Sequence, residues 1–476
     1  MTSAYIQPLN MRQVSLLQRT RVTAFSLLLV GSAAACAPER TGLVHIVVDP
    51  AEHHQTMTGW EATAQGGQWS SAYPRFRDTL LALAVNDLGI NRMRLEVRSG
   101  VEQTRDYLRD RRHGLLSGED ARCARYETVN DNDDPRLIDP RGFQFTELDE
   151  TIDTLVLPLQ RALAARGRKL LLAVTYVAFF RQCPRDRRYD HRSADEYAEF
   201  VLATVLHMRD RYQLVPDLWE IILEPDNTDD WSGTAIGEAI VASAARLSEH
   251  GIRLRFVGPS NTSMAGAVRY YDAMVAVPKV TPLLAEFSYH RYRGVSPGVL
   301  AEIAERARRD TVATSMLEHI GSGVDDLLDD LLVGHASAWS QYALAIDTDG
   351  PDDGGLYYRV DVSDSLHPVV REGERTRFLR QVFRAAPLGA VRIGATSDDP
   401  KTRPVAFRIP AGGLAVAIRT MRSTDLLVTG LAPGRYTITF ATRNVAHGTL
   451  PDSLVTAGGA LRVVMPSAGV LTLIAR

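Results

Sequence analysis

Residues 218–227 have the sequence LWEIILEPDN, in which an apolar run ends abruptly at Glu224 and Pro225. Short apolar runs of this kind are typical of strands that are buried on both faces of a parallel sheet. An ionised side chain directly after such a strand is costly to bury unless it has a partner or a function. The segment therefore predicts a buried strand whose carboxyl end presents Glu224 to a functional site.

The same pattern recurs on both sides of this segment. Counting residues 218–223, eight apolar runs predict strands, the others being a run near Thr58 and residues 90–97, 169–179, 253–261, 283–290, 312–317 and 338–347. Amphipathic segments predict helices at 147–165, 194–211, 233–250, 298–309, 324–335 and 373–384. This alternation indicates parallel strands joined by right-handed crossovers. Residues 57–385 are therefore predicted to form a (β/α)8 TIM barrel; a doubly wound open sheet is the competing fold, and no dinucleotide fingerprint accompanies it.

A long polar insertion follows the second predicted strand. Residues 98–145 include the stretch YETVNDNDDPRLIDP. Loops of this length are usually functional or disordered. Because the insertion follows a barrel strand, it is expected at the C-terminal face of the barrel, where such folds place their active sites.

The last part of the chain has a different pattern. Residues 386–476 contain short alternating runs, such as PVAFRIP and LAVAIRT, separated by Gly, Pro and Asp turns. They predict an appended all-β sandwich domain. Residues 43–56 contain a strand that has no place in the barrel and is expected to pair with this domain.

The first 36 residues have the layout of an export signal. Three arginines precede AFSLLLVGSAAAC, whose apolar core is too short to span a bilayer and ends in small residues. Cys36 follows three alanines, so the segment resembles a bacterial lipoprotein signal that is cleaved before a lipid-bearing cysteine. Plain secretion with cleavage near Ala35 is the alternative. The expected location is the cell envelope or the exterior, with membrane attachment only through a lipidated Cys36.

Two further cysteines, Cys123 and Cys183, lie in predicted loops. In an exported protein such a pair can form a disulfide bond, and two unrelated free thiols are the alternative.

Net charge and the lack of motifs argue against nucleic-acid and phosphate binding. A net charge of −3 gives no electrostatic reason to expect a nucleic-acid partner. The sequence has no Gly-rich phosphate loop, and we expect neither a cofactor nor a metal. The acidic stretches DNDDP (131–135) and DTDGPDDGG (347–355) are interpreted as solvated loops, with a cation or sugar hydroxyls as the alternative ligand of the first.

Glu318 ends the seventh predicted strand as Glu224 ends the fourth. The barrel would bring both strand ends to one pocket. Two carboxylates about 5–5.5 Å apart perform glycoside hydrolysis with retention, one as nucleophile and the other as acid and then base. The acid needs a raised pKa, and the apolar residues before Glu224 would favour its neutral form.

Several motifs resemble those of clan A glycoside hydrolases. WEIILEP is similar to W-E-I-W-N-E-P, the acid/base signature of the clan, and TSMLEHIG resembles its nucleophile strand. LGINRMRLEV and FSYHRY resemble its second and sixth strands. FLRQVFRAAPLGAVRIGATS is similar to the segment that joins barrel and sandwich in glycoside hydrolase family 30. In order and spacing, the resemblance extends over residues 43–476.

The resemblance implies a retaining glycosidase that cleaves β-glycosidic bonds of an oligo- or polysaccharide. It implies Glu224 as the acid/base, Glu318 as the nucleophile and Arg94 as the group that keeps Glu318 ionised. It also implies that His290 and Tyr292 line the pocket. Further candidate contacts to the sugar are Trp60, Tyr176, Trp339 and Tyr342.

The sequence departs from the family pattern at Leu223. Family members carry Asn before the acid/base, where it binds the sugar 2-hydroxyl. Leu cannot make this contact, and Ala343 replaces a second family Asn. Either Asn261 or Asn227 supplies the contact, or the substrate differs at that position, or catalysis has been lost. A catalytically silent carbohydrate-binding protein on the same scaffold is therefore the main alternative, and a metal-dependent barrel hydrolase is another.

Overall fold

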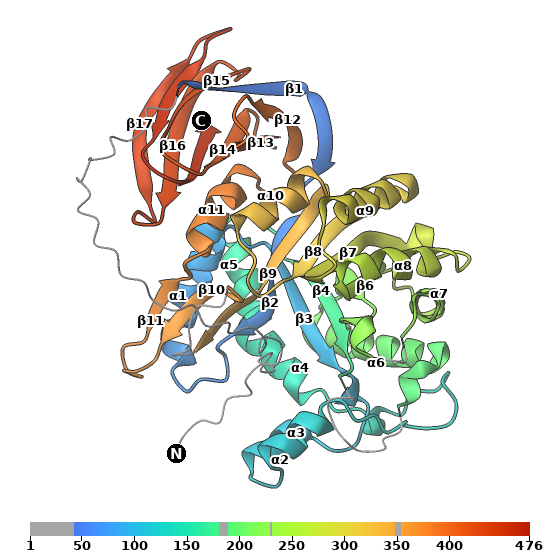
Figure 1. Ribbon diagram of the computed structural model, residues 1–476. Coiled ribbons are helices and arrows are strands. Elements are labelled where there is room, and N and C mark those ends of the chain that lie inside the picture. Colours follow the sequence, from blue (N-terminus) through green and yellow to red (C-terminus); the bar gives the residue numbers. More distant parts are fainter. Residues whose placement is uncertain (1–41, 180–188, 229–230, 348–353) are drawn as a thin grey trace, which may run out of the picture.

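The protein consists of a barrel and an all-β domain that pack against each other (Figure 1). The computed structural model describes residues 42–179, 189–228, 231–347 and 354–476. Among these residues, no helix has the length and apolar character needed to cross a membrane.

Eight parallel strands close the barrel in sequence order, because the last of them pairs with both the first and the seventh. They are β2 (Gly59–Gly66), β3 (Arg92–Arg98), β4 (Leu171–Val177), β5 (Leu218–Glu220), β6 (Arg255–Ser263), β7 (Leu284–Arg293), β8 (Ala313–Glu318) and β9 (Ala336–Asp347). This closure confirms the predicted TIM barrel and excludes the open sheet. Beyond the barrel, β9 also pairs with β10 (Leu356–Asp361), which pairs with β11 (Val369–Glu372). The sequence pattern did not indicate these two strands.

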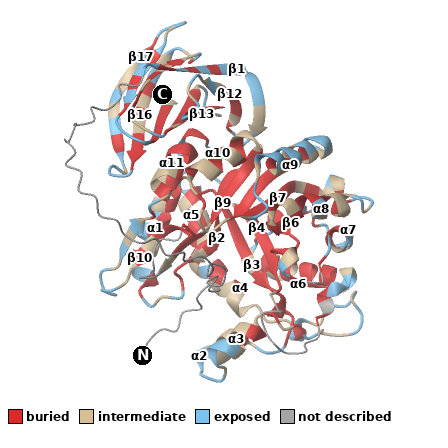
Figure 2. Ribbon diagram, in the orientation of Figure 1, coloured by how far each residue is buried: buried red, intermediate tan, exposed pale blue. Residues whose placement is uncertain are grey.

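Helices surround the barrel, with their buried sides toward it and exposed residues on their outer sides (Figures 1 and 2). They are α1 (Tyr73–Leu83), α4 (Thr146–Thr151), α5 (Leu157–Ala164), α6 (Ala194–Tyr212), α7 (Gly233–Glu249), α8 (Met264–Val275), α9 (Pro297–Asp310), α10 (Val324–Leu332) and α11 (Thr376–Ala385). The predicted helix 147–165 is α4 and α5 joined by the π-helical turn η4 (Ile152–Val156). A second π-helical turn, η1 (Ala84–Leu88), follows α1. Helices α1 and α8 were not predicted.

The insertion after β3 forms two short helices at the C-terminal face of the barrel, α2 (Tyr107–Arg112) and α3 (Gly118–Ala124). Asp106 and Ser117 begin these helices, because each side chain accepts a hydrogen bond from a backbone N–H of the first turn. Short 3₁₀ turns complete this and other loops; they are η2 (Ser99–Val101), η3 (Pro140–Gly142), η6 (Asp190–Arg192), η7 (Pro225–Asn227) and η8 (Thr281–Leu283).

The all-β domain is a nine-stranded sheet that folds over a single apolar core. Its strands are β1 (Val44–Thr56), β12 (Val391–Ser397), β13 (Thr402–Arg408), β14 (Leu414–Thr420), β15 (Thr424–Thr429), β16 (Gly434–Thr442), β17 (Gly448–Val455), β18 (Leu461–Met465) and β19 (Gly469–Ala475). Strand β1 enters this domain between β12 and β15, as Figure 1 shows. Its buried and exposed residues alternate from Val44 to Val48, so one face joins the core.

Alternation along strand β3 separates apolar side chains on its outer side from charged side chains on its inner side. On β3, Met93 and Leu95 belong to the main apolar core, whereas Arg92 and Arg94 form ion pairs with glutamates of other barrel strands. Arg92 contacts both Glu61 of β2 and Glu286 of β7 in the barrel interior. Two residues further along the strand, Arg94 is the next inward side chain and lies closer to the C-terminal end of the barrel.

Candidate active site

Glu224 and Glu318 meet at the C-terminal end of the barrel. One oxygen of each carboxylate and one ring nitrogen of His290 lie within 4.8 Å of one another. Glu318 is the last residue of β8, and Glu224 follows β5 with a left-handed backbone conformation (φ 51°). Strand β5 ends at Glu220, earlier than predicted, because the chain turns at this point. The backbone of the turn is still held by hydrogen bonds from Leu223 N to Tyr176 O and from Glu224 N to Ser260 O.

Glu318 is held by two side chains. Arg94 donates from Nη2 to Oε2, and the hydroxyl of Tyr292 donates to Oε1 at 3.1 Å. The guanidinium of Arg94 is itself positioned by Thr63, which accepts a hydrogen bond from Nη2 at 3.0 Å. All of these groups come from barrel strands, so the orientation of the carboxylate is fixed by the sheet and not by loops.

Glu224 has different partners. His290 Nδ1 lies 3.1 Å from Oε1, and the amide of Asn227 donates to Oε2 at 2.5 Å. Asp226 accepts hydrogen bonds from the backbone of Thr262 and Ser263, which ties the turn after β5 to the end of β6. The two carboxylates therefore lie close together, and among the described residues a guanidinium contacts Glu318 but not Glu224.

The surroundings give the two carboxylates different tendencies to ionise. Burial, with the nearby charge of Asp226, raises the pKa of Glu224 to about 7, against the opposing effect of Asn227. Burial also raises the pKa of Glu318, but here Arg94 is the largest opposing influence. Two carboxyl groups this close do not ionise independently, and the one that contacts the guanidinium loses its proton first. At neutral pH the favoured state therefore has an ionised Glu318 and a Glu224 that can still carry a proton.

His290 is fully buried, and burial lowers the pKa of its imidazole. A neutral ring with one N–H suits a position between two carboxyl groups, because it can donate to one of them without adding a full charge. Its Nε2 has no hydrogen-bond partner among the described residues.

Further polar residues lie on the Glu318 side of the pair of carboxylates. On β3, Glu96 accepts hydrogen bonds from Arg98 at 2.6 Å and from Gln65 of β2 at 3.4 Å. The hydroxyl of Tyr342 on β9 accepts from Gln65 at 3.1 Å, and burial, followed by the charges of Glu96 and Glu318, raises the pKa of Tyr342. Tyr342, a predicted sugar contact, thus lies near the carboxylates. Gln65, Glu96 and Arg98 were missed, although the i, i+2 spacing from Arg94 could have indicated Glu96 and Arg98.

The opposite side of the pocket is apolar. Leu223 is buried and packs with Tyr126, Val177 and the partly buried Phe179. Val177 ends β4, and Tyr126 belongs to the insertion after β3. The Leu that departs from the family pattern is therefore part of an apolar wall next to Glu224.

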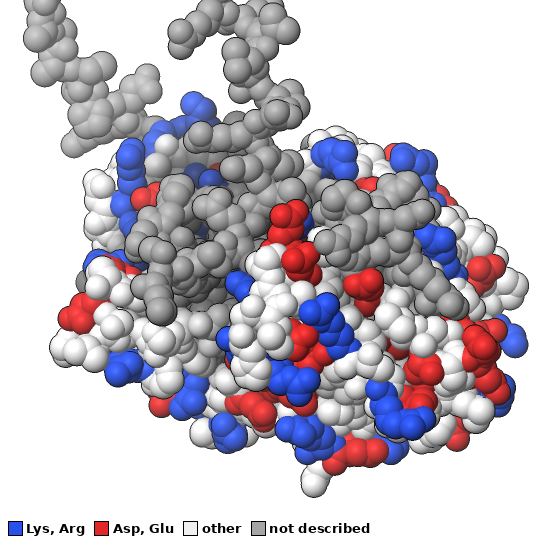
Figure 3. Space-filling view, turned by 90° about the horizontal axis from the view of Figure 1, so that it is seen from below, with Lys and Arg blue, Asp and Glu red and all other residues white. Residues whose placement is uncertain are grey.

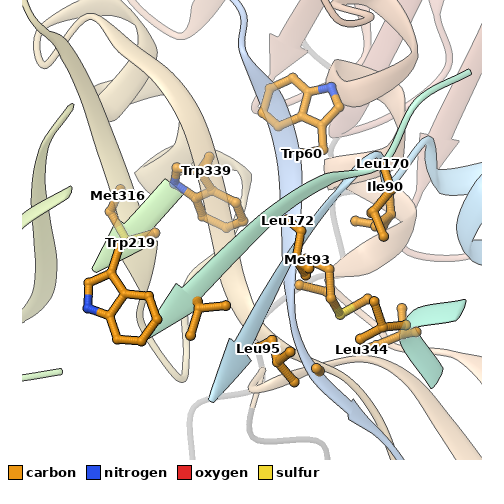
Figure 4. Close-up of a cluster of buried hydrophobic side chains, with 14 of the residues drawn as sticks. Trp60, Ile90, Met93, Leu95, Leu170, Leu172, Trp219, Met316, Trp339 and Leu344 are labelled. Atoms are coloured by element: carbon orange, nitrogen blue, oxygen red, sulfur yellow. The ribbon is translucent and has the colours of Figure 1, made fainter. Parts of the chain in front are cut away.

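Both tryptophans that were predicted as sugar contacts, Trp60 and Trp339, lie in the core. Trp60 stacks on Phe383, and its indole N–H donates to the carbonyls of Phe383 and Ala386. Trp339 is fully buried and donates to Asp330. Figure 4 shows both indoles among apolar side chains such as Leu172. Both side chains lie on the outer side of the barrel, on β2 and β9. These positions favour packing and not sugar binding.

Tyr176 is likewise fully buried on the outer side of the barrel. Its hydroxyl lies 2.8 Å from Tyr189 Oη and 2.6 Å from His191 Nδ1, and the Nε2 of this histidine lies 2.5 Å from Glu102 Oε2. This network joins β4 to the insertion after β3. Tyr176 therefore connects β4 to the insertion by hydrogen bonds, and this position does not fit the predicted contact with a sugar.

Asn261 and Asn227, the two candidates to replace the family Asn, have different positions. Asn227 contacts Glu224, as described above. Asn261 is fully buried and pairs in register with Tyr289, whose hydroxyl bonds Asp330 of α10 outside the barrel. Asn227 is therefore the better placed of the two to face a ligand.

Cys123 of α3 forms a disulfide bond. Cys183, its expected partner, and Cys36, the predicted lipidation site, lie outside the described residues.

The group of Glu224, His290 and Glu318 also has the spacing of a metal site. The guanidinium of Arg94 already neutralises Glu318, which opposes a second cation at the same oxygen.

The face toward which β3 and β4 point carries interspersed acidic and basic side chains on its described surface (Figure 3). This mixed charge does not favour a polyanionic ligand.

No protein-family model and no curated protein matches the sequence. Solved structures with the same fold include the catalytic domain of GH30 xylanase C from Talaromyces cellulolyticus, with a TM-score of 0.68 and 13% identity over 91% of this chain and 100% of that chain. A conserved exported protein from Bacteroides fragilis has a TM-score of 0.65 and 10% identity over 90% and 99% of the two chains. The endo-beta1,6-glucanase BT3312 has a TM-score of 0.59 and 15% identity over 90% and 93%. The chain thus shares its fold with these solved structures, among them a GH30 xylanase.

Proposed function

We propose that this protein is a retaining glycoside hydrolase that cleaves β-glycosidic bonds of an oligo- or polysaccharide. The observation that carries the proposal is the pair of buried carboxylates, Glu224 and Glu318, whose oxygens lie within 4.8 Å at the catalytic end of the barrel. A separation of about 5–5.5 Å between carboxyl groups suits direct attack on the sugar, whereas inverting enzymes keep a wider gap for a water molecule. The fold shared with GH30 xylanase C and a β1,6-glucanase supports this assignment.

In the first step, Glu318 attacks the anomeric carbon while Glu224 gives its proton to the leaving oxygen. The bond between sugar and leaving group breaks, and a covalent glycosyl–enzyme forms. Arg94 and Tyr292 hold Glu318 so that one oxygen faces the sugar, and their hydrogen bonds keep the carboxylate ionised before attack.

In the second step, Glu224 acts as a base. After giving up its proton it removes one from water, which attacks the anomeric carbon and releases Glu318. A pKa near 7 allows Glu224 to serve in both directions. His290, at 3.1 Å from Oε1, can stabilise whichever form of the carboxyl group is present by a hydrogen bond.

The apolar wall around Leu223 affects the choice of sugar more than the chemistry. Because Leu offers no hydrogen bond, the proposed substrate either makes its 2-position contact with Asn227 or carries no hydroxyl that needs one there. The insertion 98–145 contributes Tyr126 to this wall, so it helps to enclose the sugar.

We place this activity outside the cytoplasm, on the basis of the N-terminal export signal and of a similar fold in an exported protein. Lipidation of Cys36 would attach the enzyme to the membrane. Metabolic labelling with a radioactive fatty acid, compared with a Cys36→Ser variant, distinguishes a lipoprotein from a secreted form.

Hydrolysis of a panel of aryl β-glycosides and polysaccharides by the native protein, Glu318→Gln and Glu224→Gln tests the proposal. Loss of activity in Glu318→Gln supports Glu318 as the nucleophile. If azide restores product formation in Glu224→Ala on an activated substrate, this supports Glu224 as the acid/base. If no member of the panel is hydrolysed and one glycan binds equally to all variants, the protein is a carbohydrate-binding protein on a glycosidase scaffold.

A further inference from the structure

Strands β2 and β3 each contain one residue that is not buried. On β2 this residue is Gln65, and on β3 it is Glu96. Each comes two residues after a member of the pair Thr63 and Arg94, which lie opposite each other in register. Because side chains on one face of a strand recur every second residue, Gln65 and Glu96 lie on the inner face, about 7 Å nearer the C-terminal end of the barrel.

These two side chains contact each other and a third strand. The Nε2 of Gln65 donates to Glu96 Oε2 at 3.4 Å and to the hydroxyl of Tyr342 at 3.1 Å. Tyr342 is also partly exposed, and the carbonyl of the residue before it accepts from the backbone N–H of His319, next to Glu318. Gln65, Glu96 and Tyr342, which we call the polar layer, thus come from the adjacent strands β2, β3 and β9 and lie beside the proposed nucleophile.

Two oxygen atoms of the polar layer are free to bind a ligand. Arg98 donates to Glu96 at the oxygen that Gln65 also contacts, Oε2, so that Oε1 of Glu96 has no donor among the described residues. Oε1 of Gln65 has none within the same part of the chain. Because both residues are partly exposed, these oxygens differ from the unpaired and buried oxygens of Glu220. They can accept hydrogen bonds from hydroxyl groups of a bound molecule.

The charges around the polar layer balance. Arg98 pairs with Glu96 at 2.6 Å and lies 3.6 Å from Glu147, which also pairs with Arg125. Two guanidinium groups and two carboxylates therefore offset one another. This group has no net charge to attract an ionised sugar, whereas its free oxygens suit the hydroxyl groups of an uncharged one.

We infer that Gln65 and Glu96 select the sugar of the proposed reaction by accepting hydrogen bonds from hydroxyl groups of the glycone, the sugar that becomes bonded to the enzyme. The inference rests on the proposed function, in which the glycone is attached to Glu318 and the leaving group takes its proton from Glu224. The polar layer lies on the Glu318 side, and the apolar wall around Leu223 lies next to Glu224. The glycone is therefore the part of the substrate that meets the free oxygens.

Kinetics with p-nitrophenyl β-glycosides test the inference. The native protein and Glu96→Ala are compared on the glycoside that the native protein hydrolyses best, and on derivatives that each lack one hydroxyl of the glycone. On the complete glycoside, Glu96→Ala is expected to lower kcat/KM about 10- to 100-fold, the effect of one hydrogen bond to a charged group. On one of the derivatives it should have little effect, because the hydroxyl that Glu96 contacts is already absent.

Asp425→Ala is the matched control, because Asp425 pairs with Arg462 as Glu96 pairs with Arg98, but lies in the all-β domain. This variant should have the kinetics of the native protein. If Glu96→Ala does not fold, Gln65→Ala serves in its place, since it removes the second free oxygen.

Three results would overturn the inference and leave the proposed function intact. They are an unchanged kcat/KM in the Glu96 variant, a loss by the same factor on every derivative, which indicates a structural role, and a preference of the native protein for the β-glucuronide. If no glycoside is hydrolysed, the proposed function fails, and glycan binding then decides. A tenfold weaker binding by Glu96→Ala retains Glu96 as a sugar contact, whereas equal binding, or no binding by the native protein, overturns the inference.

Discussion

Asn227 offers a way to move the pKa of the proposed acid/base without touching either carboxylate. Its amide donates to Glu224 Oε2 at 2.5 Å and stabilises the ionised form of that carboxyl group. Replacing Asn227 by Ala removes the donor. The ionised form then loses a partner while the protonated form loses less, so the pKa of Glu224 must rise.

The size of this shift follows from the energy of the hydrogen bond. A hydrogen bond to a charged group contributes about 1.5–3 kcal/mol, and the exposed position of Asn227 puts this one near the lower end. Since one pKa unit corresponds to about 1.4 kcal/mol, the pKa should rise by about one unit. Glu224 must be protonated to act as an acid, so the alkaline limb of the pH profile should move from near pH 7 to near pH 8.

The assay is kcat/KM against pH for an aryl glycoside with a poor leaving group, which needs proton donation. A dinitrophenyl glycoside, whose leaving group departs without a proton, should show no such shift of its alkaline limb. Asn444→Ala, at an exposed Asn of the all-β domain, is the matched control. An alkaline limb that stays in place or moves to lower pH in Asn227→Ala would show that Glu224 is not the acid, or that the amide does not favour its ionised form.

Three further predictions concern the barrel interior and the pocket. Arg92→Met is expected to lower the free energy of unfolding by about 3–5 kcal/mol, because it leaves Glu61 and Glu286 buried without a counter-charge; a loss below about 1 kcal/mol in urea unfolding would contradict this. The pKa of Glu224 is about 7 in the folded protein and 4.5 in its usual surroundings. The free energy of unfolding is therefore expected to fall as the pH rises from 4.5 to 7, because the ionised form is disfavoured in the folded state. Glu224→Gln should therefore raise Tm at pH 8 and change it little at pH 4, and an equal change at both pH values would refute the shift. Tyr292→Phe removes the 3.1 Å hydrogen bond to Glu318 and should lower kcat/KM about tenfold or more with an unchanged Tm; full activity would exclude the positioning role.

The sequence predicted the barrel because an apolar run identifies each strand without knowledge of the strands that pair with it. Apolar runs alternate with amphipathic helices, and this order leaves few arrangements of a parallel sheet. The same patterns located Arg94 and Glu318 on strands and Glu224 just beyond β5, and the barrel brings the three residues together. Helices α1 and α8 and strands β10 and β11 were missed.

Aromatic residues on strands were the weakest part of the prediction. Trp60, Trp339 and Tyr176 were expected at the sugar, and the structure places all three against helices or in the core. The type of a residue does not show on which side of a strand its side chain lies. A shift of one residue in the register of the strand moves every side chain to the other side. Only the register of each strand against its neighbours decides it.

The sequence by itself determined the order of the barrel strands and indicated Glu224 and Glu318 as residues that follow or end a strand, because periodicity and strand ends are local properties. The tertiary structure alone decided what surrounds them. Closure of the sheet places Arg94 on Glu318 and His290 on Glu224, and it puts Leu223 in an apolar wall. These contacts join residues that are far apart in the chain, and burial with its consequences for pKa exists only once the barrel has closed.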